Sequence, residues 1–327
     1  MSSAAVRPQR EPTGSQKRRK RSEIFIKEEQ RDSPSSASEY AIHTPRPESD
    51  DRWFNPWQAA GEQADFERLV FMYGEHLRFM NRSLITPDEF LAELSAGVRY
   101  AAMTPKDVDR LSSVELGGLL YWIERLEPFT QLAEEDRNVL FKRYSVRKLS
   151  LDHFYVASKH PEAFQANNFM LNSNRYVNEL STGFEMESDS DSVRRAKFRL
   201  LRPTIDLSLA IVIRPFYELK VSDAEITFLH LMLMWSTSNN QHVKEATRTI
   251  MKERRDWAIN RLFTHYQQRG DNDGVVRLGE ILLLLGALEC VCQQHVKDFQ
   301  VAQLFKMDNL SQYWYENVCY NQLNIEA

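Results

Sequence analysis

Two segments with apolar faces meet at a turn within residues 119–154, and this arrangement constrains the fold more than any other part of the chain. Apolar residues recur at helical spacing on both sides of the turn, which predicts two helices that each bury one face. Pro128 should bend or end the first helix, because proline lacks the amide hydrogen that a helix interior requires. The pattern across the join consists of Phe129, Leu132, Asp136, Leu140, Phe141 and Lys142.

Helical periodicity continues through most of the chain beyond residue 53. We expect helices over residues 66–80, 87–100, 107–131, 136–159, 193–217, 222–235, 242–268 and 275–305, followed by a short one over residues 310–320. Pro203 and Pro215 should interrupt the helix over residues 193–217. Residues 167–181 carry turn residues without a helical stripe, which predicts a short β-hairpin. The sequence therefore predicts an all-α protein with one hairpin.

Two of the predicted helices begin with capping signals. Thr86 precedes Pro87, so the threonine side chain can accept a hydrogen bond from a free amide while proline takes the first helical position. Ser222 is followed three residues later by Glu225, which is the spacing of a reciprocal capping box. These signals predict where both helices start.

Residues 1–52 are rich in Ser, Pro, Arg and Glu and contain few large apolar side chains. Such a segment buries too little surface to offset its ordering entropy, so we expect a disordered, hinge-like tail before a folded domain over residues 53–327. Five consecutive cations stand in this tail, namely Lys17, Arg18, Arg19, Lys20 and Arg21. They form either a solvated linker or a nuclear-import signal or phosphate-contacting tail. We favour import, and hence a nuclear protein, because an acidic groove readily binds contiguous cations.

The sequence also argues against several classes of protein. Its net charge of −4 provides no overall attraction to nucleic acid. The three cysteines, Cys290, Cys292 and Cys319, lack zinc-ligand spacing, and none precedes residue 290. The longest apolar run, residues 281–288, is too short to span a membrane. Because a Gly-rich phosphate loop, an HExxH motif and a nucleophile elbow are all missing, we expect neither a metal site nor an enzyme.

The residues across the turn near Pro128 resemble the signature that links the third, fourth and fifth helices of nuclear hormone receptor ligand-binding domains. Two further landmarks follow in the order typical of that family. Residues 216–225 are similar to the entry to its eighth helix, and Arg277-Leu278 leads into a leucine-rich run similar to its tenth. The loose style of these motifs resembles that of divergent nematode receptors. The resemblance covers about residues 60–320 and implies a three-layer antiparallel helical sandwich.

The resemblance also implies a closed apolar ligand cavity beneath the third, fifth and tenth helices. The inward-facing candidates are Leu119, Trp122, Leu126, Phe129, Leu149, Asp152, His153, Val156, Leu284 and Leu288. Asp152 falls where acid-binding relatives carry the arginine that holds a ligand carboxylate, and a buried anion there would repel a carboxylate. Three alternatives remain open, namely a neutral lipophilic ligand, a different anchor, or a cavity filled by side chains. No other cofactor is implied.

Members of this family bind coregulator helices between a lysine at the end of the third helix and a glutamate in the last helix, which cap opposite ends of the peptide dipole. Glu124 takes the place of that lysine, with Arg125 beside it. Lys142 occupies the second lysine position of the groove, and Glu316 lies in a segment similar to the last helix. Because Glu124 reverses one charge, we expect the usual coactivator complex to be weaker by ~1 kcal/mol.

Five apolar residues in a row, 281–285, leave no polar face on the helix that resembles the family's dimerisation helix. We therefore expect a homodimer or heterodimer interface that includes Arg277, Leu283 and Leu285. The leading hypothesis is a ligand-regulated or orphan transcription regulator that dimerises and recruits coregulators but binds no specific DNA by itself. Such a chain would be an isoform of a longer protein or a receptor without zinc fingers. The alternative is a ligand-free helical scaffold for protein interactions.

Overall fold

The computed structural model describes residues 56–172, 174–178, 180–236, 242–270, 272–307, 310 and 314–319. Every described residue belongs to one compact unit, Phe54–Ala327. The predicted tail over residues 1–52, with its five cations, lies outside the described residues.

Helices account for most of the described residues. The α-helices are α1 (Pro56–Arg82), α2 (Pro87–Ala96), α3 (Pro105–Ile123), α4 (Glu134–Ser158), α5 (Pro161–Gln165), α6 (Asp191–Ser208), α7 (Arg214–Glu218), α8 (Asp223–Met234), α9 (Glu245–Gln268) and α10 (Gly274–Leu304). A 3₁₀ turn, η1 (Phe129–Gln131), lies between α3 and α4, and the π-helical segment η2 (Leu209–Ile213) lies between α6 and α7. A second π-helical segment, η3 (Tyr315–Cys319), follows α10. None of the described helices is long and apolar enough to cross a membrane.

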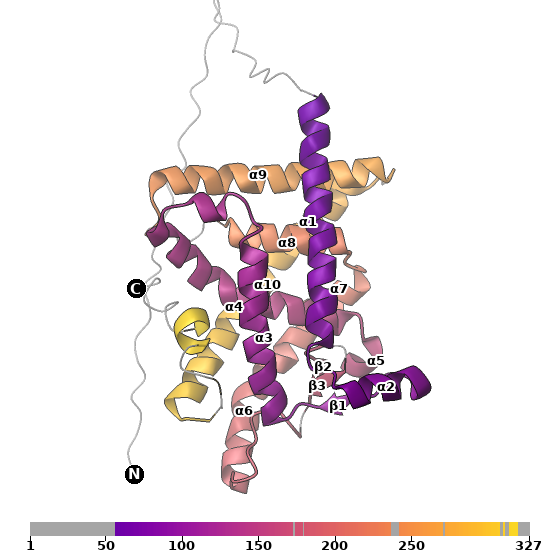
Figure 1. Ribbon diagram of the computed structural model, residues 1–327, viewed down its shortest axis with the longest axis vertical. Helices are drawn as coiled ribbons and strands as arrows, with labels where there is room; N and C mark the ends of the chain where they lie inside the picture. Colours follow the sequence, from indigo (N-terminus) through magenta and orange to yellow (C-terminus); the bar gives the residue numbers. More distant parts are fainter. Residues whose placement is uncertain are drawn as a thin grey trace, which may run out of the picture. The chain divides into compact units, whose positions relative to one another are not determined.

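Helices α4 and α8 form the centre of the unit, and the other long helices pack around them. Every residue of α8 from Ala224 to Met234 is buried, including the polar Glu225, Thr227 and His230, so this stretch of the helix has no side that faces solvent. In Figure 1, α1 and α3 lie side by side in front of α4 and α8. Helix α10 contacts both central helices and α6. This arrangement confirms the predicted helical sandwich.

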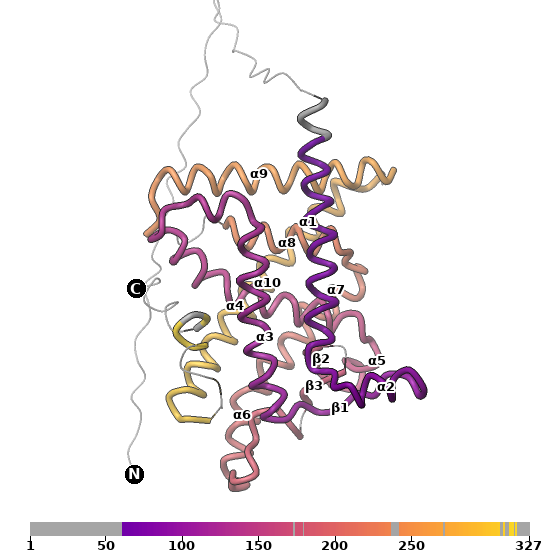
Figure 2. Tube along the Cα trace, viewed as in Figure 1, coloured from indigo at the N-terminus to yellow at the C-terminus, as the bar shows by residue number. Residues whose placement is uncertain are grey.

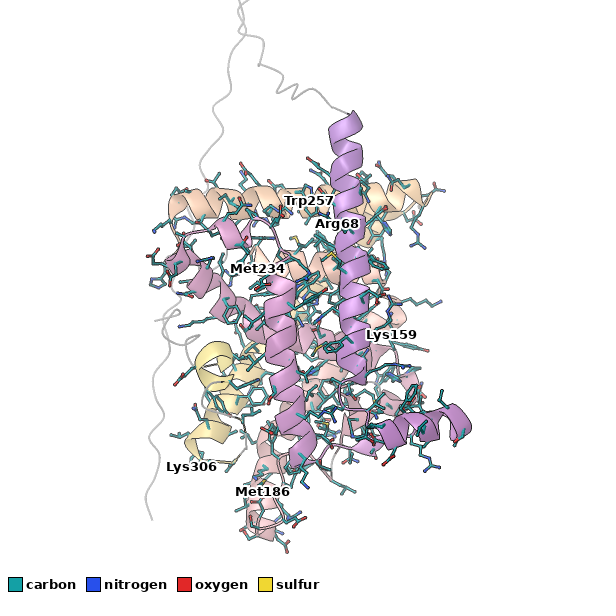
Figure 3. All side chains as sticks on the ribbon, viewed as in Figure 1. Arg68, Lys159, Met186, Met234, Trp257 and Lys306 are labelled. Atoms are coloured by element: carbon teal, nitrogen blue, oxygen red, sulfur yellow. The ribbon has the colours of Figure 1, made fainter. Side chains whose placement is uncertain are left out.

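Helix α9 crosses the first half of α1, as the traces in Figure 2 show. Phe66 of α1 is fully buried and meets the ring of Trp257 of α9 edge-on, with the ring centroids 6.1 Å apart. Figure 3 labels Trp257 and Arg68 at this crossing. An aromatic pair in this geometry stabilises a fold by about 1 kcal/mol beyond the area that it buries.

Both predicted capping signals are confirmed. The Thr86 hydroxyl accepts a hydrogen bond from the amide of Glu89, and the Glu89 carboxylate accepts one from the amide of Thr86. Ser222 and Glu225 form the same reciprocal pair at the start of α8. Reciprocal bonds of this kind satisfy amides that a helix start would otherwise leave free.

The predicted hairpin is also confirmed, and it belongs to a small sheet. Strand β2 (Phe169–Met170) is antiparallel to β3 (Arg175–Val177), and β1 (Ala101–Ala102) pairs with the other edge of β3 in parallel. The prediction of a helix up to residue 100 was too long. Helix α2 ends at Ala96, because the next residue, Gly97, has a φ of +79°, which does not continue a right-handed helix.

The prediction that Pro203 interrupts a helix is wrong, since α6 continues through this residue. Before Pro215 the chain changes to the π-helical segment η2 and then enters α7 without a break. The wider π turn relieves the clash that a proline ring makes with the carbonyl four residues earlier in a regular α-helix. The predicted third helix was too long at its end, since α3 stops at Ile123 and η1 follows.

Candidate functional site

An apolar cavity of about 130 Å³ lies between α3, α4, α6, α10 and the small sheet. Its apolar lining includes Val108 and Leu111 of α3, Val146 and Leu149 of α4, Phe169 of β2, Ile205 of α6 and Phe299 of α10. Trp314 and Val318 from the end of the described chain complete the wall. Because an engineered apolar cavity of about 150 Å³ binds benzene, this cavity admits a ligand of similar bulk without expanding.

Four of the residues predicted from the sequence border this cavity or a smaller space beside it. Leu149 and His153 line the cavity, while Asp152 and Val156, again with His153, line a space of about 20 Å³. The other six are buried but lie outside both linings, namely Leu119, Trp122, Leu126, Phe129, Leu284 and Leu288. The structure therefore places the cavity nearer the start of α3 and the end of α10 than the sequence predicted.

The predicted residues of α3 face the helical core instead of the cavity. The Trp122 indole donates a hydrogen bond to the Tyr144 hydroxyl at 2.9 Å, and its ring stands edge-on to Tyr73 of α1. Val108 and Leu111, which do line the cavity, lie earlier in the helix. Periodicity identifies the inward face of a helix, but the surrounding side chains decide which part of that face borders a void.

An ion pair stands at the polar end of the cavity. Glu115 of α3 contacts His153 of α4 through Oε1 and Nε2. Burial by itself would lower the pKa of His153, but the Glu115 carboxylate raises it above its usual value. Glu115 was not predicted from the sequence. The signal that could have identified it is an acidic residue on the apolar stripe of a helix that is predicted to be buried.

Two further polar groups border the cavity from α10. The Nδ1 atom of His295 lies 3.1 Å from the Ser150 hydroxyl, and burial lowers the pKa of His295 to about 3, so this imidazole is neutral. Asp298 accepts hydrogen bonds from Thr204 and Gln294, while burial raises the pKa of its carboxyl group. In the described part of the chain, no three His, Cys, Asp or Glu side chains are grouped so as to hold a metal ion.

Asp152 does not line the main cavity, because three partners hold its carboxylate inside the core. Lys148 Nζ lies 2.6 Å from Oδ2, the Tyr73 hydroxyl donates to Oδ1 at 2.7 Å, and His230 Nε2 lies 3.0 Å from Oδ1. Burial would raise the pKa of Asp152, but Lys148 and His230 hold it well below its usual range. Asp152 thus links α4 to α1 and α8 and is not an anchor for a ligand in the cavity.

The same network brings α1 and α3 close together. His76 Nε2 of α1 lies 2.8 Å from Lys148 Nζ, and burial together with this lysine lowers the pKa of His76 to about 3. A Cβ atom at Gly118 of α3 would come within 2.7 Å of His76 and 2.8 Å of Met80. Only glycine therefore fits at this point of α3.

An apolar cluster packs the last described segment onto α4 and α10. The cluster consists of Val146, Leu149, Val296, Trp314, Tyr315 and Val318. Trp314 stands edge-on to Phe299 with the ring centroids 5.1 Å apart, and both rings line the cavity. Leu149 also belongs to the cluster and to the cavity wall. A molecule in the cavity would therefore touch the side chains that hold the last segment in place.

The residues predicted for the coregulator groove lie at the surface or close to it. Glu124 is exposed at the end of α3, and the Arg125 guanidinium stacks on the Tyr121 ring with its central carbon 3.4 Å from the ring centroid. Lys142 of α4 is half-buried, and Glu316 of η3 is exposed. A partner helix that approaches the end of α3 would thus meet an acidic side chain first.

Within residues 281–285, helix α10 exposes one apolar side chain to solvent, whereas the sequence predicted apolar side chains on every side of the helix. Ile281 and Leu284 are buried, and Leu285 is half-buried. Leu283 is 80% exposed. An apolar side chain this accessible on a helix of the outer layer is a candidate contact for a partner chain.

Arg277, which the sequence placed at the dimer interface, is tied into the fold. Its Nε lies 2.6 Å from Glu225 Oε1, and its Nη2 donates to the Leu219 carbonyl at 2.6 Å. The Tyr266 hydroxyl donates to the same Glu225 oxygen at 2.8 Å. Burial would raise the pKa of Glu225, but Arg277 lowers it. The pair links α10 to α8, so among the three residues predicted for the interface Leu283 is the one that is exposed.

Similarity to known proteins agrees with this architecture. A model of the ligand-binding domain of nuclear hormone receptors matches residues 101–305. The nuclear hormone receptor family member nhr-71 of Caenorhabditis elegans is 50% identical over 266 residues, which cover 80% of this chain and 46% of that protein. Family member nhr-22 of the same organism is 23% identical over 207 residues, covering 61% of this chain and 35% of that protein. The chain thus spans less than half the length of these relatives. With a matching domain model over residues 101–305 and a relative that is 50% identical over 80% of the chain's length, this chain belongs to the nuclear hormone receptor family.

Proposed function

We propose that this chain is the ligand-responsive part of a nuclear transcription regulator. The observation that carries the proposal is the shared wall, since Trp314 and Val318 of the last segment line the same cavity as residues of α3, α4 and α10. A ligand in the cavity adds contacts to Trp314 and so stabilises the docked arrangement of this segment. A ligand that favours one arrangement of a surface segment changes which partners that surface can bind.

The cavity favours an uncharged ligand with an apolar body. Two acidic side chains, Glu115 and Asp298, border it, and the cation His153 is already paired with Glu115. A carboxylate ligand would meet this negative potential, and the described lining of the cavity offers no free cation to offset its desolvation. Ser150 and His295 offer hydrogen bonds to a hydroxyl or carbonyl group. We therefore assign a small neutral lipophilic ligand with one polar substituent.

Native mass spectrometry of the purified protein tests this assignment. We expect a small bound mass that disappears when the protein is denatured. Leu149→Phe places a larger side chain in the cavity and should abolish the bound mass while the melting temperature is retained. The matched control is Leu285→Phe, which enlarges a half-buried leucine outside the cavity lining and should leave the bound mass unchanged. A wild-type protein that carries no mass and ignores hydrophobic ligands would favour the ligand-free scaffold instead.

Two partner surfaces complete the proposal. The exposed Leu283 of α10 supports a dimer through this helix. The surface around Glu124, Arg125 and Lys142 would receive coregulator helices, and the docked last segment would contribute Glu316 of η3. Because Glu124 is acidic, this groove should prefer partners other than the usual coactivator helix. The role proposed for the chain is regulatory and not catalytic.

A further inference from the structure

A second binding site lies outside the cavity, in an open groove of about 570 Å³ between α6 and the end of α10. Its walls carry Arg195, Arg199 and Leu200 of α6 and, on the opposite side, Val301, Phe305 and Met307. None of the described residues that line this groove also lines the ligand cavity. The groove therefore combines two cations with an apolar floor at a place that the proposed function does not use.

The two arginines of the groove are unusual for α6 because their charges are not offset. Arg194 donates to the carbonyls of Asp189 and Met186, and Arg202 pairs with Asp206. Arg195 and Arg199 are exposed, and neither makes a hydrogen bond or ion pair within the described residues. They stand one helical turn apart, so both guanidinium groups project to the same side of the helix and repel each other.

The apolar floor is held in place by the way α10 ends. Lys306, labelled in Figure 3, has a φ of +51°, a left-handed conformation that is uncommon for a residue other than glycine. The amide of Lys306 donates to the Gln303 carbonyl at 3.0 Å, and the amide of Met307 donates to the Ala302 carbonyl at 2.8 Å. This pair of bonds is a Schellman motif, which turns Met307 back against the helix. Phe305 remains 63% exposed beside it.

We propose that this groove binds a single-chain lipid with a phosphate monoester head group. A phosphate monoester carries a charge of about −1.5 to −2 at neutral pH, which matches the two guanidinium groups of Arg195 and Arg199. The alkyl chain would lie over Val301, Phe305 and Met307. A carboxylate would neutralise only one of the two cations.

The probe for this proposal is octyl phosphate, used below its micelle concentration and titrated into the whole chain by isothermal calorimetry. We expect saturable binding that weakens as salt is raised, because the two arginines are exposed to screening. Inorganic phosphate should bind much more weakly, since it lacks the apolar chain. Octanol should not compete, since it lacks the charge.

Three variants and a matched control decide between the outcomes. Arg195→Gln and Arg199→Gln should each weaken octyl phosphate binding by at least about fivefold, since a charge-assisted hydrogen bond is lost. Phe305→Ser should also weaken octyl phosphate binding, because it removes an apolar contact with the alkyl chain. Arg110→Gln, which removes an exposed arginine of α3 outside the groove, should leave binding unchanged.

Three results would overturn the proposal. One is octyl phosphate binding that is unchanged in both arginine variants. The other is loss of that binding in Leu149→Phe, because the probe would then occupy the ligand cavity. An acidic peptide that binds with the same dependence on the arginines, while octyl phosphate does not bind, would also overturn it. Leu149→Phe should abolish binding in the cavity without changing the groove. The test of the groove and the test of the proposed function can therefore fail independently of each other.

Discussion

Lys148 and Asp152 stand one turn apart on α4 with the ammonium nitrogen 2.6 Å from the carboxylate, and both side chains are buried in the middle of the helical sandwich. A buried charge of this kind is tolerated only while its partner remains. Tyr73 and His230 use the other carboxylate oxygen, so the pair is also a junction between α1, α4 and α8.

Lys148→Met should therefore be strongly destabilising. The substitution leaves the Asp152 carboxylate buried without its cation, which typically costs about 3–5 kcal/mol of folding free energy. Urea unfolding followed by circular dichroism measures the loss. The double variant Lys148→Met/Asp152→Asn removes both charges and should recover part of it. If the two variants are equally unstable, the cost lies in lost packing and not in the unpaired charge.

Stability should decline in acid partly through His295. Burial lowers its pKa in the folded state to about 3, whereas the unfolded chain keeps a value near 6.5. Between these values the unfolded state binds the proton and the folded state does not, so each pH unit below 6.5 costs ~1.4 kcal/mol. His76 shifts in the same direction and contributes in parallel.

The contribution of His295 is isolated by comparing the wild type with His295→Phe between pH 6.5 and 4. The variant keeps an aromatic ring beside Phe154 and Phe299 but cannot take up a proton. The difference in unfolding free energy between the two proteins should therefore change with pH by ~1.4 kcal/mol per unit. Curves that stay parallel over this range would show that His295 is accessible to protons in the folded state.

Leu283→Arg should dissociate a dimer without unfolding the domain. The leucine is 80% exposed, so the new charge remains in water in the monomer but would be buried in an interface. Leu284→Arg is the contrasting variant, because Leu284 is buried and an unpaired charge there should unfold the domain. Sedimentation and circular dichroism separate the two effects. A wild-type protein that stays monomeric at high concentration contradicts the dimer.

Local signals explain why so much of the helical framework could be predicted. Thr86 and Ser222 mark helix starts through bonds that span three residues, and the apolar stripes need only the helical period. Strand β1 could not be predicted in the same way. It consists of two residues, and Ala101 pairs with Arg175, more than seventy positions later in the chain. Nothing near Ala101 encodes that contact.

The cavity could be predicted only in part for a related physical reason. Leu149 and His153 were identified because the inward face of α4 follows from its period. Glu115, His295 and Asp298 were missed, since a void arises where side chains from several helices fail to fill space, and no single helix records it. Asp152 was assigned to the ligand, but its real partners lie on other turns and helices.

The five cations at residues 17–21 lie outside the described residues, and their role is tested directly in cells. Replacing Lys17, Arg18, Arg19, Lys20 and Arg21 by neutral residues should disperse a nuclear fluorescent fusion through the cell. In vitro, any DNA binding by the wild-type chain should be nonspecific and should collapse as salt is raised, because such binding depends on counterion release. A nuclear signal that does not change in the variant would assign import to another segment.

Glu124→Lys should convert the coregulator groove toward the usual preference of the family. The exposed glutamate at the end of α3 opposes the negative C-terminal end of a partner helix, and a lysine there attracts it. The substitution removes a repulsion between Glu124 and the dipole of the peptide helix and adds an attraction from the lysine. Together these changes should strengthen binding of a Leu-x-x-Leu-Leu peptide by about tenfold. Fluorescence anisotropy of a labelled peptide measures the change, and Glu253→Lys, which changes an exposed glutamate of α9, is the matched control. Because a general increase in positive charge would strengthen binding in both variants, only a gain confined to Glu124→Lys supports the groove.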